Sequence, residues 1–367
     1  MHSGTKVVHE RVSESSSRTM QHTVLEGALN CIATNKDSSQ VVVAGRNVFK
    51  IFSIEDDQFV EKHNLRVGRN INLNFSASNV AWNPVDDHIL ASAATNSSVV
   101  IWDLNKTSRS KLDTVYSEHR RFVSKVAFHH TESHLLLSGS QDGFMKLFDL
   151  KKKEVCTTFS GRSESVRDVT FNPHHYFQFA AAFENGNVQI WDLRKLDKWE
   201  RQFTAHSGPI FSLDWHPDDK NILASAGRDK TIKIWDMQLL KPKNLHTVQS
   251  IASVARCKWR PQRKYHIASC ALLVDCSVNV WDIRRPYIPF AAFKEHKDVV
   301  TGIVWKQNDP HVFLSSSKDC TLWQHMFKDA SRPANSANPV GLSINIRGDV
   351  SHAFSDKLVS GNKSGSS

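Results

Sequence analysis

Serine, histidine and aspartate recur together at three places in this 367-residue chain, and this combination of side chains can do hydrolytic chemistry. The three sets are His119, Ser138 and Asp142, then His206, Ser225 and Asp229, and finally His296, Ser315 and Asp319. In a hydrolase the serine attacks, the histidine takes its proton and the aspartate orients the histidine. Such a serine needs exposure and an oxyanion hole, and a catalytic site is not normally repeated three times in one chain. We therefore interpret the sets as a structural network of buried hydrogen bonds that ties loops to strands.

The three sets belong to a longer repeat that fixes their positions. Strand-like runs end in an aromatic residue and an aspartate at five places, with steps of 46, 43, 44 and 46 residues: Trp102-Asp103, Phe148-Asp149, Trp191-Asp192, Trp235-Asp236 and Trp281-Asp282. A fixed step of this size indicates an architecture in which each unit buries its apolar faces against its neighbours. With the β-rich stretch before each pair and the upstream histidine, the pattern predicts an all-β fold, a WD40 β-propeller.

One repeat serves as the reference for placing the polar residues. Alternating polarity and turn residues predict strands at 209–215, 221–226 and 231–237, separated by tight turns. His206 then precedes the first strand, Ser225 lies on the second and Asp229 lies in the next turn, so the three should converge on Trp235. We expect replacement of Trp235 or Asp229 to damage folding, since truncating a large buried aromatic residue costs about 3–5 kcal/mol.

The same template fits five further repeats, at 80–104, 123–150, 166–193, 254–283 and 300–327, the last with His325-Met326 in the Trp-Asp position. A degenerate repeat with strands at 28–34, 40–44 and 47–54 brings the number of blades to seven. Outer strands are predicted at 58–63, 111–116, 154–159, 200–203, 244–248 and 290–293. The seventh outer strand is missing, and an open sheet edge needs a partner. Residues 22–26 or residues 341–346 could supply it, and we favour the N-terminal segment.

These boundaries define one propeller domain at 19–350, with a disordered N-terminal tail at 1–18 and a flexible C-terminal tail at 351–367. The six cysteines form no C-x-x-C pair, and no phosphate-binding, nucleophile-elbow or H-E-x-x-H motif is present. We therefore expect no enzyme activity, no cofactor and no metal. The histidine pairs His129-His130 and His174-His175 fall in predicted turns, where turn polarity explains them better than metal binding.

The chain is basic, with a formal net charge of +10 and a pI near 9.3. This charge could serve nucleic acid, an anionic membrane surface or acidic proteins. The basic residues lie in small scattered groups rather than in one dense stripe, so we interpret most of them as solvated loop residues and expect no nucleic-acid partner. No apolar stretch resembles a membrane helix or a targeting signal, which favours the cytosol or nucleus.

Segments outside the repeat signature resemble the WD repeat-containing protein 24 family of GATOR complex subunits. The similar residues are found at 41–46, 49–51, 64–69, 136–146, 163–169, 183–189, 251–256 and 327–331. The resemblance runs from about residue 19 to about residue 342, including loops and degenerate repeat positions.

This resemblance implies a cytoplasmic scaffold, recruited to the lysosomal surface, that promotes target-of-rapamycin signalling when amino acids are sufficient. It would do so by opposing the GATOR subcomplex that activates GTP hydrolysis by Rag GTPases. The implied partners are other GATOR subunits and sestrin-type amino-acid sensors, and membrane association would be only indirect. The ubiquitin-ligase activity ascribed to the family would need a RING-type zinc domain, for which these residues have no Cys/His cluster.

Two other functions stay open at this stage. The W-D-x-R sequences ending at Arg194 and Arg284 look like the signature of substrate receptors that dock on the adaptor of cullin-type ubiquitin ligases. These two arginines would be the adaptor contacts. The alternative of a nucleic-acid-binding propeller depends on charge alone and predicts binding that weakens steeply with salt.

Overall fold

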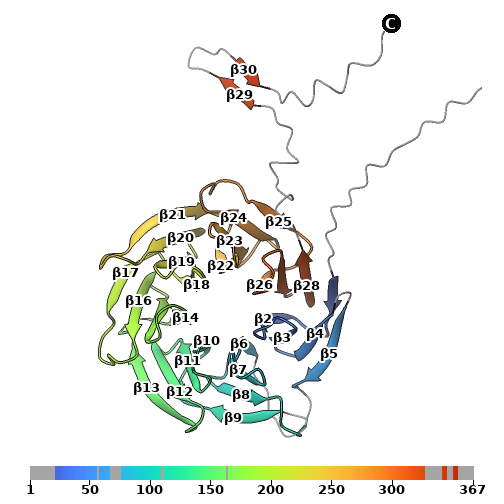
Figure 1. Cartoon of the computed structure of the whole chain (residues 1–367), viewed down its shortest axis with the longest axis vertical. Coiled ribbons are helices and arrows are strands. Elements are labelled where there is room, and N and C mark those ends of the chain that lie inside the picture. Colours follow the sequence, from blue (N-terminus) through green and yellow to red (C-terminus); the bar gives the residue numbers. More distant parts are fainter. Residues whose placement is uncertain are drawn as a thin grey trace, which may run out of the picture.

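The aromatic-aspartate repeat folds into four-stranded antiparallel sheets that stand side by side around a central axis (Figure 1). The computed structural model describes residues 21–55, 58–66, 76–108, 111–162 and 164–326, and the backbone of β29 (Gly341–Ile344) and β30 (Val350–Ala353). Seven sheets have four strands each, and we number them as blades 1 to 7, with strands a to d running from the axis to the rim. The predicted seven-bladed β-propeller is confirmed.

Blades 1 to 4 follow one another along the chain. Their strands are β2 (Leu29–Thr34), β3 (Gln40–Gly45), β4 (Phe49–Ile54) and β5 (Phe59–Asn64); β6 (Ala77–Trp82), β7 (Ile89–Ala94), β8 (Val99–Asp103) and β9 (Leu112–Tyr116); β10 (Val123–Phe128), β11 (Leu135–Ser140), β12 (Phe144–Asp149) and β13 (Glu154–Ser160); and β14 (Val166–Phe171), β15 (Gln178–Phe183), β16 (Asn187–Asp192) and β17 (Arg201–Thr204).

Blades 5 to 7 complete the ring. Their strands are β18 (Ile210–Trp215), β19 (Ile222–Gly227), β20 (Thr231–Asp236) and β21 (Lys243–Gln249); β22 (Val254–Trp259), β23 (His266–Ala271), β24 (Val278–Asp282) and β25 (Ala291–Phe293); and β26 (Val300–Trp305), β27 (Val312–Ser317), β28 (Thr321–Met326) and β1 (Gln21–Val24).

The ring is closed by the N-terminal segment. Strand β1 pairs antiparallel with β28, with Gln21 opposite Gln324 and Val24 opposite Thr321. The favoured closure is therefore confirmed, and the alternative through 341–346 is wrong, because β29 pairs with β30 in a separate two-stranded sheet. Blade 7 thus joins strands from both ends of the described ring, which removes the open edge that a propeller would otherwise expose.

Apolar side chains fill the spaces between blades. In the space between blades 3 and 4, Leu137, Met145 and Phe159 pack against Phe171 and Trp191, all of them buried. Similar clusters lie between other neighbouring blades, so each sheet depends on the next for its burial. Among the described residues, no helix is long and apolar enough to cross a bilayer.

The two faces of the disc carry different turns. Because the strands of each blade are antiparallel, the d–a and b–c turns lie on one face, which we call the upper face. The a–b and c–d turns lie on the other, the lower face. The blades themselves span Gln21 to Met326. The domain boundary at 350 and the two tails involve residues outside the described part, apart from β29 and β30, and stay predictions.

Candidate functional site: the central cavity and its polar supports

A register shift places one side chain from every blade at the upper end of the central axis. In each blade the pairing of strands a and b skips the second residue of strand a, as between Val123 and Lys125 in blade 3. A residue left out of the ladder in this way has its side chain re-aimed. The seven skipped residues all line one cavity: Asn30, Ser78, Ser124, Arg167, Phe211, Ala255 and Thr301.

Small polar residues fasten neighbouring blades together in one half of this ring. Ser78 Oγ donates to the carbonyl of Val123 at 2.6 Å, and Ser124 Oγ donates to that of Val166 at 2.6 Å. Asn30 and Thr301 make equivalent bonds, at 3.0 Å each, to the first residue of the next inner strand. In blades 7, 1, 2 and 3 the skipped residue is therefore committed to holding the ring closed.

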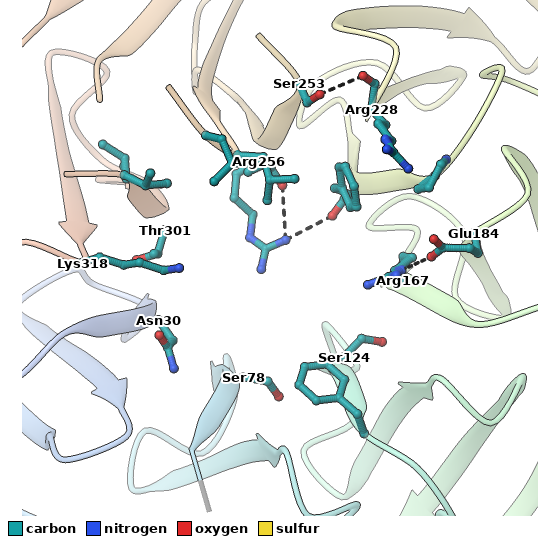
Figure 2. A pocket seen from close by; sticks show the side chains of 18 of the residues that line it. Asn30, Ser78, Ser124, Arg167, Glu184, Arg228, Ser253, Arg256, Thr301 and Lys318 are labelled. Atoms are coloured by element: carbon teal, nitrogen blue, oxygen red, sulfur yellow. Dashed lines mark hydrogen bonds and ion pairs between the residues drawn. The ribbon is translucent and has the colours of Figure 1, made fainter. Parts of the chain in front are cut away.

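The other half of the ring carries charge and an aromatic ring instead. Arg167 in blade 4 pairs with Glu184 and lies over the ring of Phe211, with 5.9 Å from the guanidinium carbon to the ring centroid. Arg256 in blade 6 donates to the carbonyl of Phe211 at 3.1 Å. Figure 2 shows the guanidinium group of Arg256 reaching into the central space between the blades. In blades 4 to 6, all of whose residues are described, the skipped residues make no side-chain hydrogen bond to the next inner strand, and Arg256, beside the skipped position, links blade 6 to blade 5 while its guanidinium group faces the cavity.

The cavity is large enough for a peptide side chain or a short segment. Its volume is about 760 Å³, and its rim on the upper face includes Arg228 and Lys318 from b–c turns. Neither forms an ion pair with another described residue, and Glu184 is the single carboxylate among the lining side chains. Beside these cations lie the exposed side chains of Leu272 and Leu273. Cations in a recessed, partly apolar site raise the local concentration of anionic groups, so this mouth suits an acidic segment with apolar side chains.

The predicted polar residues converge within their blades. In blade 5, His206 Nδ1 lies 2.9 Å from the carboxylate of Asp229, and His206 Nε2 lies 2.7 Å from Ser225 Oγ. Trp235 Nε1 donates to the same Ser225 oxygen at 2.9 Å. Because the carboxylate accepts from Nδ1–H, Nε2 must accept from the serine hydroxyl, whose oxygen then accepts from tryptophan. Every donor in this series of hydrogen bonds therefore has an acceptor, and Ser225 is fully buried.

The other two sets have the same arrangement with local differences. His119 lies 2.9 Å from Asp142 and 2.6 Å from Ser138 in blade 3, where Phe148 replaces the tryptophan. In blade 7, His296 lies 3.2 Å from Asp319 and 2.7 Å from Ser315. There the tryptophan position holds His325, whose Nε2 lies 2.7 Å from Ser315 Oγ. Histidine at this position therefore makes the same contact with the serine that tryptophan makes elsewhere.

These surroundings shift the aspartate pKa values. Burial alone would raise the pKa of Asp142, but hydrogen bonds from His119 and from the backbone N–H of Arg120 lower it to about 2. Against the effect of burial, hydrogen bonds from His206 and Thr231 lower the pKa of Asp229, and hydrogen bonds from Thr321 and the backbone N–H of Lys297 lower the pKa of Asp319. Burial lowers the pKa of His296, so its ring favours the neutral form that the hydrogen-bond pattern requires. The serines are buried, so this arrangement offers a substrate no access.

The two arginines of the W-D-x-R sequences are held by their own blades. Arg194 makes a two-pronged contact with Asp192, with NH2 to Oδ2 at 2.6 Å, and its guanidinium carbon lies 4.4 Å from the ring centroid of Phe177. Arg284 repeats this arrangement with Asp282 and an aromatic ring at 4.2 Å. Both side chains stay more than half exposed. Their contacts explain arginine at this position without an adaptor.

The histidine pairs contribute to contacts between blades. His129 Nε2 lies 2.8 Å from the carbonyl of Tyr176 in the next blade, and His174 Nε2 lies 3.0 Å from that of His216. Within the described residues, no group of three or more His, Cys, Asp or Glu side chains could hold a metal ion.

Sequence reasoning missed the cavity residues. They are not a motif of fixed residue type, since the seven skipped positions hold Asn, Ser, Ser, Arg, Phe, Ala and Thr. The available signal was positional, because each lies one residue after the start of a strand a. Comparing the residue types at that position around the ring would have singled out Arg167 and Phe211.

Comparisons with known proteins agree with this architecture. A family model described as "MIOS, WD40 repeat" matches residues 118–255, and one described as "WD domain, G-beta repeat" matches residues 288–324. A chain of the solved structure "Crystal Structure of Mitotic Checkpoint Complex" superimposes with a TM-score of 0.71, and the alignment covers 84% of the present chain and 91% of that chain. At 19% sequence identity, that likeness shows the fold alone.

Much higher identity links the chain to a set of curated relatives. It is 57% identical to the GATOR2 complex protein WDR24 of Danio rerio over 95% of this chain and 45% of that protein. The same-named protein of Homo sapiens is 55% identical over 93% of this chain and 43% of the relative, and that of Drosophila melanogaster is 51% identical over 94% and 44%. The chain spans less than half the length of these relatives. It is therefore a relative of the GATOR2 complex WDR24 proteins and matches them over the WD-repeat propeller.

Proposed function

We propose that this chain is a non-catalytic protein-interaction scaffold that uses the mouth of its central cavity to dock an acidic segment of a partner. The observation that carries the proposal is the asymmetry of the ring. Four skipped residues fasten blades together, whereas blades 4 to 6 present Arg167, Phe211 and Arg256 to the cavity. Such a half-ring of half-buried cations and an aromatic ring, open to the upper face through the cavity mouth, offers recognition and no chemistry.

The relationship to the WDR24 proteins supports a more specific role. We infer that the propeller works within a GATOR2-type assembly that promotes target-of-rapamycin signalling when amino acids are sufficient. In this role it would oppose the subcomplex that activates GTP hydrolysis by Rag GTPases. Its partners would be other subunits of the assembly and sestrin-type amino-acid sensors. Its place would be the cytoplasm, with recruitment to the lysosomal surface.

Any ubiquitin-ligase activity of the family would lie in a RING-type zinc domain and not in the propeller. The described residues offer no metal-binding group of the required kind. The ligase-receptor and nucleic-acid alternatives are not favoured, because the arginines of the first are held by Asp192 and Asp282 and the second depends on scattered charge.

The experiment that tests the proposal is affinity capture with a charge-reversed cavity mouth. The tagged chain and its Arg228→Glu/Lys318→Glu variant are expressed in amino-acid-fed and starved cells, and captured proteins are quantified by mass spectrometry. Both residues are exposed, so the variant should melt at the same temperature as the parent. A matched control reverses two exposed lysines away from the cavity, Lys62 and Lys152.

The proposal predicts that the parent and the control recover GATOR2 subunits or amino-acid sensors, while the mouth variant loses at least one of them. Equal recovery by all three proteins would show that the cavity mouth is not the docking site. Recovery of no subunit or sensor by the parent would contradict the scaffold role itself.

A further inference from the structure

Large apolar side chains gather on the lower face of blades 4 to 6, away from the cavity. The c–d loop of blade 5 exposes Leu240 at 88%, and that of blade 6 exposes Tyr287 at 89% and Ile288 at 70%. Leu239 and, in the c–d loop of blade 4, Leu196 are exposed as well. In the described lower-face turns of the other blades, Val85 is the single exposed large apolar residue. Several large exposed apolar side chains gathered on one face mark an interaction surface.

The c–d loops of blades 4 and 5 are tied together, and the blade 6 loop is fixed to its own blade. Arg201 at the start of β17 donates to the carbonyl of Leu239 at 3.0 Å, which links blade 4 to blade 5. Leu196 and Leu240 line the same hollow between these blades. In blade 6, Arg284 holds the loop to its own strand through Asp282.

Prolines fix the two most exposed tips. Pro286 and Pro289 bracket Tyr287 and Ile288, and Pro242 follows Leu240 after one residue. Proline restricts the backbone, so these loops lose little conformational freedom when they bind. The prolines thus keep the neighbouring apolar side chains exposed to solvent.

Basic residues stand beside the apolar tips. Lys241 and Lys243 follow Leu240, while Arg284 and Arg285 precede Tyr287. Lys241, Lys243 and Arg285 form no ion pair with another described residue. Two acidic residues of blade 4, Asp197 and Glu200, line the hollow with Leu240, and Glu200 pairs there with Lys195 at 3.0 Å. The blade 5 and blade 6 loops therefore combine protruding apolar side chains with uncompensated positive charge.

We propose that this lower face docks directly on an anionic lipid bilayer, with the tips of blades 5 and 6 inserted among the headgroups. Apolar and tyrosine side chains partition into the interfacial region, and flanking Lys and Arg side chains contact anionic lipids. Tips that protrude singly and are separated by charges fit a deformable interface better than a rigid complementary protein. Docking through the lower face leaves the cavity mouth on the upper face free, so a propeller at a membrane can still hold a partner. The family resemblance implies only indirect membrane association, so direct docking goes beyond it.

Vesicle flotation tests the proposal with the whole chain. The probes are vesicles of phosphatidylcholine alone and of phosphatidylcholine with phosphatidylserine. One variant removes two tips, Leu240→Ser/Ile288→Ser, and a second neutralises two cations, Lys241→Gln/Arg285→Gln. The control, Ile251→Ser/Val274→Ser, removes two exposed apolar residues of the upper face that do not line the cavity. All six positions are solvent-exposed loop residues, so each variant should melt at the temperature of the parent, which verifies folding.

The parent should float with the phosphatidylserine vesicles, and far less with phosphatidylcholine alone. Each Lys or Arg near an anionic surface contributes roughly a fivefold change in partitioning, so the Gln variant should bind about 25-fold more weakly. The tip variant should lose at least about tenfold, and the control should stay within about twofold.

Absence of parent binding to the anionic vesicles would overturn the proposal. So would equal losses in the control and in the lower-face variants. If the lower-face variants leave vesicle binding unchanged but lose a captured protein, the face is a protein interface and the membrane proposal is wrong.

Discussion

Ser225 is the residue whose removal tests most sharply whether the His-Ser-Asp sets are structural. Its hydroxyl donates to His206 and accepts from Trp235, at 2.7 and 2.9 Å. Ser92 in blade 2 is the matched control, because it is also fully buried but its oxygen accepts from Trp102 alone, at 3.0 Å. Each buried polar group left unpaired costs about 1–3 kcal/mol. Ser225→Ala should therefore lower the free energy of unfolding by about 2–6 kcal/mol, and Ser92→Ala by about 1–3 kcal/mol.

Urea unfolding followed by tryptophan fluorescence measures both losses, provided that the slope of the free energy of unfolding against urea concentration is the same in the variants and the parent. A second measurement combines Ser225→Ala with His206→Ala. Because both residues belong to one hydrogen-bond chain, the second substitution should cost less than it does alone, with a coupling of about 0.5–3 kcal/mol. His119→Ala, in another blade, should add its full cost to that of Ser225→Ala.

Equal losses for Ser225→Ala and Ser92→Ala would refute this reasoning. So would strict additivity within blade 5. A hydrolytic activity that disappears with Ser225 while the stability stays unchanged would restore the catalytic interpretation.

Three further predictions concern pH, backbone and ring closure. The fold lowers the pKa of Asp142 to about 2, so its ionised carboxylate stabilises the folded protein fully above the ordinary aspartate pKa, and this stabilisation is lost as pH falls from about 4 through about 2. When the free energy of unfolding is measured against pH in this range, it should fall less steeply for Asp142→Asn than for the parent. Gly186 has φ of +83° and a Cβ there would lie 2.0 Å from a backbone oxygen, so Gly186→Ala should lower the melting temperature by several degrees, whereas Gly208→Ala, with no atom within 4 Å of its Cβ, should change it little. Deleting residues 21–24 exposes the edge of β28, and hydrogen exchange should then rise in Thr321–Met326 but not in β20; unchanged protection of β28 would contradict closure by β1.

The periodic part of the fold could be predicted from the sequence because every blade obeys the same constraints. Turn residues and alternation placed the reference strands within about one residue of β18, β19 and β20. The degenerate first blade was predictable for the same reason, since its apolar pattern persists although Phe52-Ser53 replaces the Trp-Asp pair. Closure could not be derived in the same way, because two segments had suitable strand propensity and only the pairing of β1 with β28 decides between them.

The candidate site was predictable only in its supporting parts. Residue type and repetition identified His206, Ser225 and Asp229, because buried polar groups demand specific partners. The cavity residues depend on a register shift in strand a, and a shift of one residue leaves no trace in composition or in motif spacing. The role of Arg194 was likewise hidden, because its partner ring, Phe177, lies in a different turn of the same blade.

The central claim is that the cavity mouth on the upper face holds an acidic segment of a protein partner. Cross-linking mass spectrometry of the captured assembly tests it most directly, with a reagent that joins lysine amines to carboxylates. The account predicts cross-links from Lys318, at the mouth, to an Asp- or Glu-rich segment of a partner, and their loss in the Arg228→Glu variant. The claim would be contradicted if partner cross-links were confined to lysines away from the cavity, such as Lys62 and Lys152, and none formed at Lys318.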